Sequence, residues 1–232
     1  MGRNRDKVQS TGAIIVAAGE STRMDGEDKL FVQLGGRPLL ARVIDAFDRC
    51  QAIDRIILVA REEKLVEANQ MITRHNWFKT VDVCTGGSRR QDSVMAGLEA
   101  LGKCDWVVIH DGARPMVTTD LIDRGLEAAR ETGAAVAAVP VTDTIKVAGE
   151  DRIVQYTPSR ENLWAVQTPQ VFSYKTITEA YKQVTNDVTD DASLVEKSGQ
   201  QVKLYQGSYD NVKVTTPDDL ALVRFLWQIS RE

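Results

Sequence analysis

Small and cationic residues follow the first apolar run of the sequence. Ala17, Ala18 and Gly19 would let the backbone approach a phosphate chain closely, and the nearby Arg23 and Lys29 add positive charge. A tight turn carrying two solvated cations would show the same pattern. The stretch is neither a Walker A loop, because G-x-x-x-x-G-K-[ST] is absent, nor a G-x-S-x-G nucleophile elbow, because Arg23 replaces the second glycine. The residues therefore favour phosphate binding over hydrolase chemistry.

A second polar stretch contains a glycine pair followed by serines and arginines. Gly86 and Gly87 would allow a flat ring to come close, and Ser93 with nearby backbone groups could bind the edge of a base. The alternative is an ordinary helix N-terminus capped by Ser88. On its own, this stretch leaves base binding and helix capping both open.

A third stretch, His110–Pro115, follows a strongly apolar run. Asp111 would lie at the carboxyl end of a strand, where α/β proteins bind substrates and Mg²⁺. An ion pair between Asp111 and Arg114 that fixes the loop is the alternative. The chain has two histidines, His75 and His110, and they lie far apart, so we expect neither a histidine metal site nor a Ser-His-Asp triad. Asp111 is therefore the candidate ligand for a metal ion or a polar substrate.

Elements that could position these residues alternate through the first 140 residues. Short apolar runs typical of strands buried on both faces occur at Ala13–Ala17, Ile53–Ala60, Thr80–Cys84, Trp106–His110 and Ala134–Pro140. Segments with helical periodicity lie between them, at Pro38–Asp48, Glu62–His75, Arg89–Leu101 and Thr118–Glu131. Pro38 and Pro217 both fit first helical turns. The alternation predicts an α/β fold with a doubly wound, mostly parallel sheet, which binds ligands at the carboxyl ends of its strands.

The alternation stops after Pro140. Val141–Tyr156 predicts a hairpin of two strands around the tip Gly149-Glu150-Asp151. An isolated hairpin is marginally stable in water, so we expect this β-arm, residues 141–160, to pack against a second subunit in a homodimer. The remaining predicted elements are strands at Trp164–Phe172 and Val202–Tyr205 and helices at Ser173–Val184, Asp190–Ser198 and Pro217–Ser230.

The composition fits a single domain over residues 1–232. The chain is 43% hydrophobic and 27% charged, enough to bury one sizeable core. Its 29 Lys and Arg against 33 Asp and Glu give a net charge of −4, which provides no case for nucleic-acid binding. Three widely spaced cysteines favour a reducing cytoplasm over a disulfide framework. We expect no membrane segment, since no run approaches the roughly 20 apolar residues that a span requires.

Six ordered blocks, from near residue 12 to the last helix, together resemble the cytidylyltransferase family of the non-mevalonate isoprenoid pathway. The blocks are Ala17-Ala18-Gly19 with Arg23, Gly86-Gly87 through Asp92-Ser93, His110-Asp111 with Ala113-Arg114-Pro115, Leu163-Trp164 with Gln167-Thr168-Pro169-Gln170, Thr189-Asp190-Asp191-Ala192, and Asn211-Val212-Lys213-Val214-Thr215. The resemblance implies a Rossmann-like nucleotidyltransferase fold. It also implies Mg²⁺-dependent transfer of CMP from CTP to 2-C-methyl-D-erythritol 4-phosphate, with release of pyrophosphate.

The resemblance assigns roles to individual residues. It places CTP against Ala17, Ala18, Gly19, Arg23, Lys29, Gly86, Gly87, Ser93 and Asp111. It places the polyol phosphate against Asp111, Arg114, Thr144, Arg160, Thr168, Thr189 and Lys213. Arg23, Lys29 and Lys213 would be catalytic, and Mg²⁺ would be held mainly by the CTP phosphates, with Asp111 as the candidate protein ligand. The stretch from Asp25 to Asp28 is more acidic and shorter than the family pattern.

The expected chemistry is in-line attack of the acceptor's phosphate oxygen on the α-phosphorus of CTP. A phosphate monoester has its second pKa near 6, so the nucleophile is ionised at neutral pH and needs no general base. One alternative is a ribitol 5-phosphate cytidylyltransferase, which would share the nucleotide motifs. A nucleotide-sugar glycosyltransferase is disfavoured because the sequence has no D-x-D motif. A non-catalytic nucleotide-binding module of the same fold is disfavoured by the cationic residues on several loops.

Overall fold

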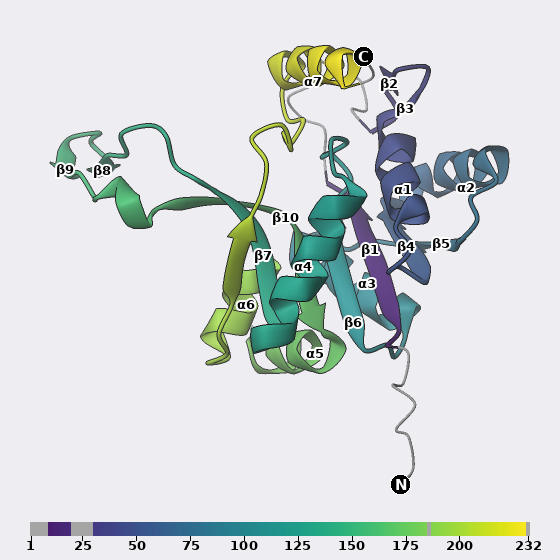
Figure 1. Ribbon diagram of the computed structural model, residues 1–232, viewed down its shortest axis with the longest axis horizontal. Coiled ribbons are helices and arrows are strands. Elements are labelled where there is room, and N and C mark those ends of the chain that lie inside the picture. Colours follow the sequence, from purple (N-terminus) through teal and green to yellow (C-terminus); the bar gives the residue numbers. More distant parts are fainter. Residues whose placement is uncertain (1–8, 20–29, 185–186, 231–232) are drawn as a thin grey trace, which may run out of the picture.

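A mixed seven-stranded sheet lies at the centre of the computed structural model, which describes residues 9–19, 30–184 and 187–230 (Figure 1). The strand order is β11-β7-β10-β6-β1-β4-β5. β10 is antiparallel to both its neighbours, β6 and β7, while the other pairings in the sheet are parallel. The strands are β1 Thr11–Ala17, β4 Arg55–Ala60, β5 Thr80–Thr85, β6 Trp106–Asp111, β7 Ala134–Pro140, β10 Trp164–Ser173 and β11 Lys203–Gln206.

The central strands are almost completely buried. Ile14 of β1 lies in register with Ile57 of β4 and Ile109 of β6, and all three side chains are inaccessible to solvent. Strands buried on both faces read as continuous apolar runs, which is why the sequence shows runs of Val, Ile, Leu and Ala here instead of alternation.

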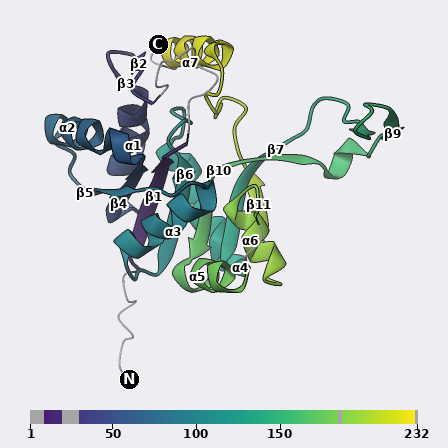
Figure 2. The same cartoon turned by 180° about the vertical axis from the view of Figure 1, so that it is seen from behind.

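Helices cover both faces of this sheet, as the two opposite views show (Figures 1 and 2). One face packs against α1 Leu39–Arg49, α2 Leu65–His75 and α4 Thr119–Thr132. The other face packs against α3 Arg90–Leu101, α5 Tyr174–Gln183 and α6 Asp191–Lys197. The predicted doubly wound α/β fold is therefore confirmed.

The last helix, α7 Pro217–Ile229, lies beyond the carboxyl ends of the parallel strands (Figure 1). It encloses a small separate core with the ribbon β2 Gln33–Leu34 and β3 Arg37–Pro38, and the Arg42 guanidinium lies 4.6 Å from the centre of the Trp227 ring. Pro217 starts α7 as predicted. Pro38 does not lie in a first helical turn: it pairs in β3 with Gln33 and immediately precedes α1.

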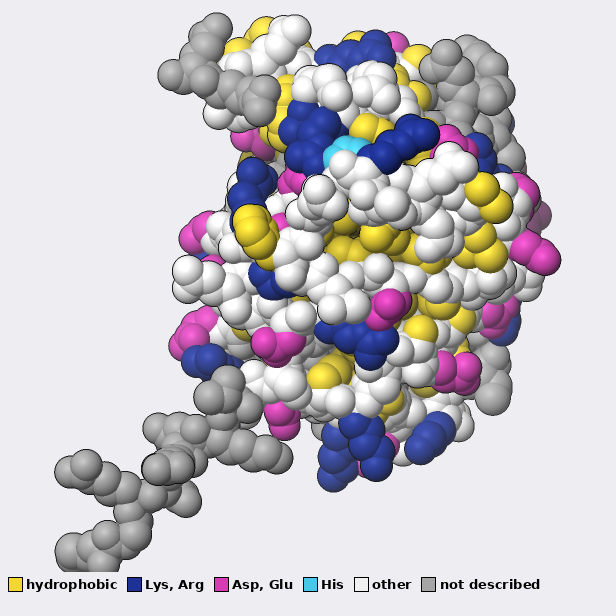
Figure 3. Space-filling view, turned by 90° about the vertical axis from the view of Figure 1, so that its right-hand side faces the viewer, with side chains coloured by type: hydrophobic (Ala, Val, Ile, Leu, Met, Phe, Trp, Pro, Cys, Tyr) yellow, Lys and Arg dark blue, Asp and Glu magenta, His cyan; other side chains and the backbone are white. Residues whose placement is uncertain are grey.

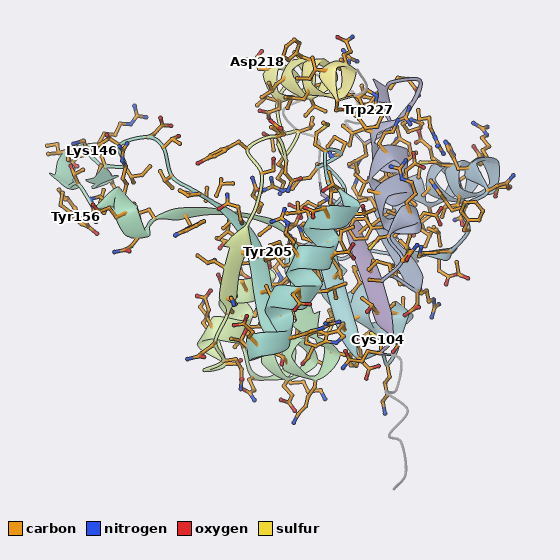
Figure 4. All side chains as sticks on the ribbon, viewed as in Figure 1. Cys104, Lys146, Tyr156, Tyr205, Asp218 and Trp227 are labelled. Carbon is orange, nitrogen blue, oxygen red and sulfur yellow. The ribbon has the colours of Figure 1, made fainter. Side chains whose placement is uncertain are left out.

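The predicted hairpin leaves the sheet between β7 and β10. Its strands are β8 Val147–Ala148 and β9 Val154–Tyr156, and a 3-10 turn at Arg160–Asn162 leads back into β10. The arm projects away from the sheet and its helices, with Lys146 and Tyr156 near its tip (Figure 4). The expected β-arm is thus confirmed as a structural element.

The helix boundaries lie within a few residues of the predicted ones, with two informative differences. A 3-10 turn at Glu62–Lys64 precedes α2, and α3 is capped by Arg89 with Asp92 and not by Ser88.

On the face turned toward the viewer in Figure 3, basic and acidic side chains are interspersed. No helix in the described part of the chain is long and apolar enough to cross a bilayer.

Candidate active site

A cavity of about 630 Å³ opens at the carboxyl ends of β1, β5 and β6, the size of a small-ligand pocket. Most of the predicted nucleotide residues line it: Ala17, Ala18, Gly19, Gly86, Gly87, Ser93 and Asp111, together with the predicted catalytic Lys213. Sequence reasoning did not select the other polar residues of the lining, which are Arg61, Glu62, Glu63, Thr85, Ser88, Arg89, Arg90 and Thr215. Arg23 and Lys29 lie outside the described residues.

The glycine pair brings two loops close together in one wall of this cavity. A Cβ atom on Gly86 would lie 2.4 Å from the Cβ of Ala18 and 2.7 Å from the Oγ of Ser93. The Gly87 N–H donates to the Ser93 Oγ at 3.2 Å, and Ser93 is buried. Only glycine permits this approach, and the buried Ser93 hydroxyl supports the wall from behind.

A second, smaller cavity of about 220 Å³ adjoins the first. It collects five of the predicted acceptor residues: Asp111, Arg114, Thr168, Thr189 and Lys213. Arg90, Asp111 and Lys213 line both cavities. A molecule in one cavity and a molecule in the other would therefore meet at these three side chains.

Asp111 is the anionic centre of this border. Its carboxylate lies 2.8 Å from the Lys213 Nζ, 3.3 Å from the Arg90 Nε and 3.9 Å from the Arg114 Nε. Burial alone would raise the pKa of Asp111, but the charges of Arg90 and Lys213 outweigh burial and hold that pKa below its ordinary value. The contact with Arg114 is the longest of the three, so a simple Asp111–Arg114 loop pair does not describe the site.

The buried His110 contacts Arg114 and Thr168 and so holds the Asp111 loop in place. Its Nδ1 lies 3.1 Å from the Thr168 Oγ1, its Nε2 lies 3.1 Å from the carbonyl oxygen of Arg114, and Thr168 also accepts from the Asp111 N–H. Burial lowers the pKa of His110 to about 4. One neutral tautomer satisfies all three contacts, with Nε2–H donating to Arg114 and Nδ1 accepting from the Thr168 hydroxyl. His110 is therefore a structural residue at neutral pH.

Of the three side chains that line both cavities, Arg90 is the one that sequence reasoning did not select. It lies within the glycine-serine block, but its main partner, Asp191, is 101 residues away, with the Nη1 2.7 Å from the Asp191 carboxylate. Burial would lower the pKa of Arg90, yet the carboxylates of Asp191 and Asp111 raise it. In the sequence, Arg90 could have been selected only as a cation within the glycine-serine block, because no spacing rule connects Arg90 to Asp191.

Two predicted acceptor residues lie apart from both cavities. Thr144 and Arg160 are exposed on the arm, and Arg160 donates to the carbonyl oxygen of Thr142 at 2.7 Å.

The described residues contain no cluster of three or more His, Cys, Asp or Glu side chains that could hold a metal ion. Among the carboxylates described, Asp111 is the one that borders both cavities.

Comparison with known proteins gives one consistent result. A family model for 2-C-methyl-D-erythritol 4-phosphate cytidylyltransferase matches residues 11–228. The chain is 47% identical over 223 residues to the protein of that name from Dehalococcoides mccartyi, covering 96% of this chain and 98% of the relative. It is 42% identical to the same-named protein from Alkaliphilus oremlandii, covering 98% and 99%.

Solved structures agree with the sequence relatives. The 4-diphosphocytidyl-2C-methyl-D-erythritol synthase from Anaerococcus prevotii has a TM-score of 0.85 and 31% identity, covering 96% of this chain and 100% of that one. The 2-C-methyl-D-erythritol 4-phosphate cytidylyltransferase from Thermus thermophilus has a TM-score of 0.77 and 31% identity, covering 95% and 99%.

Proposed function

This chain belongs to the 2-C-methyl-D-erythritol 4-phosphate cytidylyltransferase family, and on that premise we propose that it transfers CMP from CTP to 2-C-methyl-D-erythritol 4-phosphate. The products are 4-diphosphocytidyl-2-C-methyl-D-erythritol and pyrophosphate, in the biosynthesis of isoprenoid precursors. We expect the enzyme to work in the cytoplasm, in keeping with its three free thiols.

The observation that carries the proposal is the meeting of the two cavities at Asp111, Lys213 and Arg90. The larger cavity has the glycine wall that a flat base requires, and the smaller one offers hydroxyl, carboxylate and guanidinium groups that suit a polyol phosphate. Transfer of a nucleotidyl group requires the α-phosphorus and the acceptor oxygen to meet, and the border between the cavities is where they would do so.

Lys213 is suited to act on the charge that develops during transfer. Its ammonium lies at the border, and its side chain is 41% exposed, so it can turn to a phosphate oxygen. The acceptor phosphate is already ionised at neutral pH, so the reaction needs no general base. The neutral, buried state of His110 is consistent with such a mechanism. Arg23 and Lys29 are proposed to hold the triphosphate.

We propose Mg²⁺ as the cofactor. When bound, Mg²⁺ would neutralise phosphate charge and orient the α-phosphate. The donor set fits an ion held mainly by the CTP phosphates, because Asp111 supplies an ionised carboxylate at the border, whereas Glu62, Glu63 and Asp190, the other described carboxylates of the lining, each line only one of the two cavities. Loss of activity on chelation, with recovery on addition of Mg²⁺, would test the requirement.

The arm is proposed to join two copies in a homodimer. It exposes Ile153, Val154 and Tyr156, each more than half accessible, on a ribbon that extends away from the sheet (Figure 4). Apolar side chains on a projecting ribbon are stabilised when a partner covers them. In such a dimer, Thr144 and Arg160 would complete the acceptor cavity of the partner subunit.

A pyrophosphate-release assay tests the proposed activity. CTP, Mg²⁺ and 2-C-methyl-D-erythritol 4-phosphate should release pyrophosphate at a much higher rate than the same mixture with ribitol 5-phosphate. A preference for ribitol 5-phosphate would identify the alternative acceptor. If neither acceptor causes release of pyrophosphate, the result would favour a non-catalytic nucleotide-binding module.

A further inference from the structure

A chain of three polar contacts runs from the partly buried Tyr181 to Asp111. The Tyr181 hydroxyl donates to one oxygen of Asp191 at 2.7 Å, and the Arg90 Nη1 donates to the other oxygen at 2.7 Å. The Arg90 Nε then reaches Asp111 at 3.3 Å. The four side chains come from α5, α6, α3 and β6, and Tyr181 and Asp191 line neither of the two cavities.

Asp191 is buried, and a buried carboxylate is stable only when its charge is paired and its oxygens accept hydrogen bonds. Both requirements are met by Arg90 and Tyr181. Burial, and then the charge of Asp191, raise the pKa of Tyr181, so its hydroxyl remains a donor. The adjacent backbone is held as well, since the Ala192 N–H donates to Gln170 of β10 at 3.1 Å. Asp191 therefore forms a fixed anchor for the Arg90 guanidinium.

The anchor limits how Asp111 can be oriented. Arg90 approaches one carboxylate oxygen of Asp111, and Lys213 approaches the other. A guanidinium fixed at its far end holds its planar fork in one direction, unlike a flexible ammonium. With Arg90 fixed, Asp111 keeps one orientation at the border of the two cavities, where its carboxylate oxygens can accept hydrogen bonds from hydroxyl groups of an acceptor.

We propose that Tyr181 and Asp191 are positioning residues, which act through Arg90 to orient Asp111 for the hydroxyl groups of the acceptor. This inference rests on the proposed function, because it assigns the polyol to the Asp111 border. It makes acceptor binding depend on a tyrosine that never contacts the substrate. A purely structural role, in which Tyr181 only joins α5 to α6, is the competing explanation.

The test is a double-mutant cycle with Tyr181→Phe and Asp111→Asn. Tyr181→Phe should raise KM for 2-C-methyl-D-erythritol 4-phosphate about tenfold, the size expected when a hydrogen bond to a charged group is lost. The Kd of CTP, measured by calorimetry, should change by a smaller factor than this KM, because Arg90 and Asp111 supply only part of the lining of the larger cavity. In the Asp111→Asn background, Tyr181→Phe should have no further effect on KM, because the residue it positions is already lost.

Tyr174→Phe is the matched control. Tyr174 lies on the same helix and packs against the same core, so its substitution should leave both constants unchanged. Asp191→Asn provides a second variant with the same expected pattern. If the effects of Tyr181→Phe and Asp111→Asn on KM simply multiply, or if Tyr181→Phe lowers only the melting temperature, the positioning role is wrong.

Wild-type measurements separate this inference from the proposed function. If the wild-type enzyme turns over the acceptor and the cycle shows independent effects, only the positioning role fails. If calorimetry shows no binding of any polyol phosphate to the wild-type enzyme, the proposed function fails, and the positioning role fails with it.

Discussion

The ammonium of Lys213 lies 2.8 Å from the carboxylate of Asp111, at the border of the two cavities. The two partners differ in exposure: the Lys213 side chain is 41% exposed and that of Asp111 only 10%. Lys213 can therefore turn from the carboxylate to an incoming phosphate while Asp111 stays in place. This pair gives the site a cation that is held in position before the substrates arrive.

Lys213→Ala should lower kcat sharply, because the ammonium is placed to meet charge that builds during transfer. Loss of one such group typically lowers kcat by about 100-fold or more. Steady-state kinetics with both substrates measures the effect, and Lys175→Ala, on an exposed face of α5, is the control. A normal kcat with a raised KM would assign Lys213 to ground-state binding instead.

Stability should fall as the pH drops from about 6.5 to about 4, because of His110. The folded pKa is about 4 and the unfolded pKa is about 6.5. Within this window the unfolded chain binds a proton that the folded chain does not, so acid favours unfolding. Relative to neutral pH, this pKa difference lowers the free energy of unfolding by about 2 kcal/mol at pH 5 and by roughly 3 kcal/mol at pH 4.

Urea unfolding at pH 7.5 and pH 5 measures this loss in the free energy of unfolding. His110→Gln should lose part of the pH dependence, whereas His75→Gln, which replaces the other histidine, should keep it. An unchanged pH dependence in His110→Gln would mean that His110 is not the group responsible.

Gly86→Ala should raise KM for CTP, because the new Cβ would lie 2.4 Å from Ala18 and force the cavity wall to move. Gly97→Ala crowds Ile14 at 2.6 Å, away from the cavity, and is the control for packing damage. Both substitutions should lower stability by about 1–3 kcal/mol. In the wild type, CTP should be preferred over UTP, ATP and GTP. Equal KM values for CTP in the two variants, or equal turnover of ATP by the wild type, would contradict the assignment of this wall to cytosine.

Arg160 should act in the site of the partner subunit. If Arg160→Ala and Lys213→Ala chains are each inactive, co-refolding them in equal amounts should restore about a quarter of the wild-type activity, because half the dimers are mixed and each has one intact site. Sedimentation should show a dimer. An inactive mixture, with subunit exchange demonstrated by differently tagged chains, would place Arg160 in its own subunit's site, and a monomer would rule out the shared site.

Local patterns predicted most of the fold. The runs of apolar residues in β1, β4 and β6 are long enough to be recognised as buried strands, and the tip at Gly149–Asp151 identified the arm. Pro38 was placed wrongly because the short β2–β3 ribbon leaves little periodic signal. The sequence offers Ser88 as a cap for α3, but Arg89 and Asp92 form the capping pair, which depends on backbone geometry.

The candidate site was less accessible to sequence reasoning. Asp111 and Lys213 could be selected because they occupy recognisable blocks, and the structure brings them together. The roles of Arg90 and Asp191 could not be inferred, because they depend on a contact across 101 residues and on burial. Thr168 could be selected as a site residue, but its use of His110 as a hydrogen-bond partner appears only in three dimensions.

Label transfer from CTP tests the central claim most directly. CTP carrying ³²P at the α-position, incubated with 2-C-methyl-D-erythritol 4-phosphate and Mg²⁺, should give a labelled cytidylyl product, while CTP labelled at the γ-position should give labelled pyrophosphate and an unlabelled product. Attack at the α-phosphorus, beside Lys213 and Asp111, predicts this division of label. Transfer of the γ-label to the acceptor, or absence of α-label transfer to this acceptor, would contradict the proposed cytidylyltransferase activity.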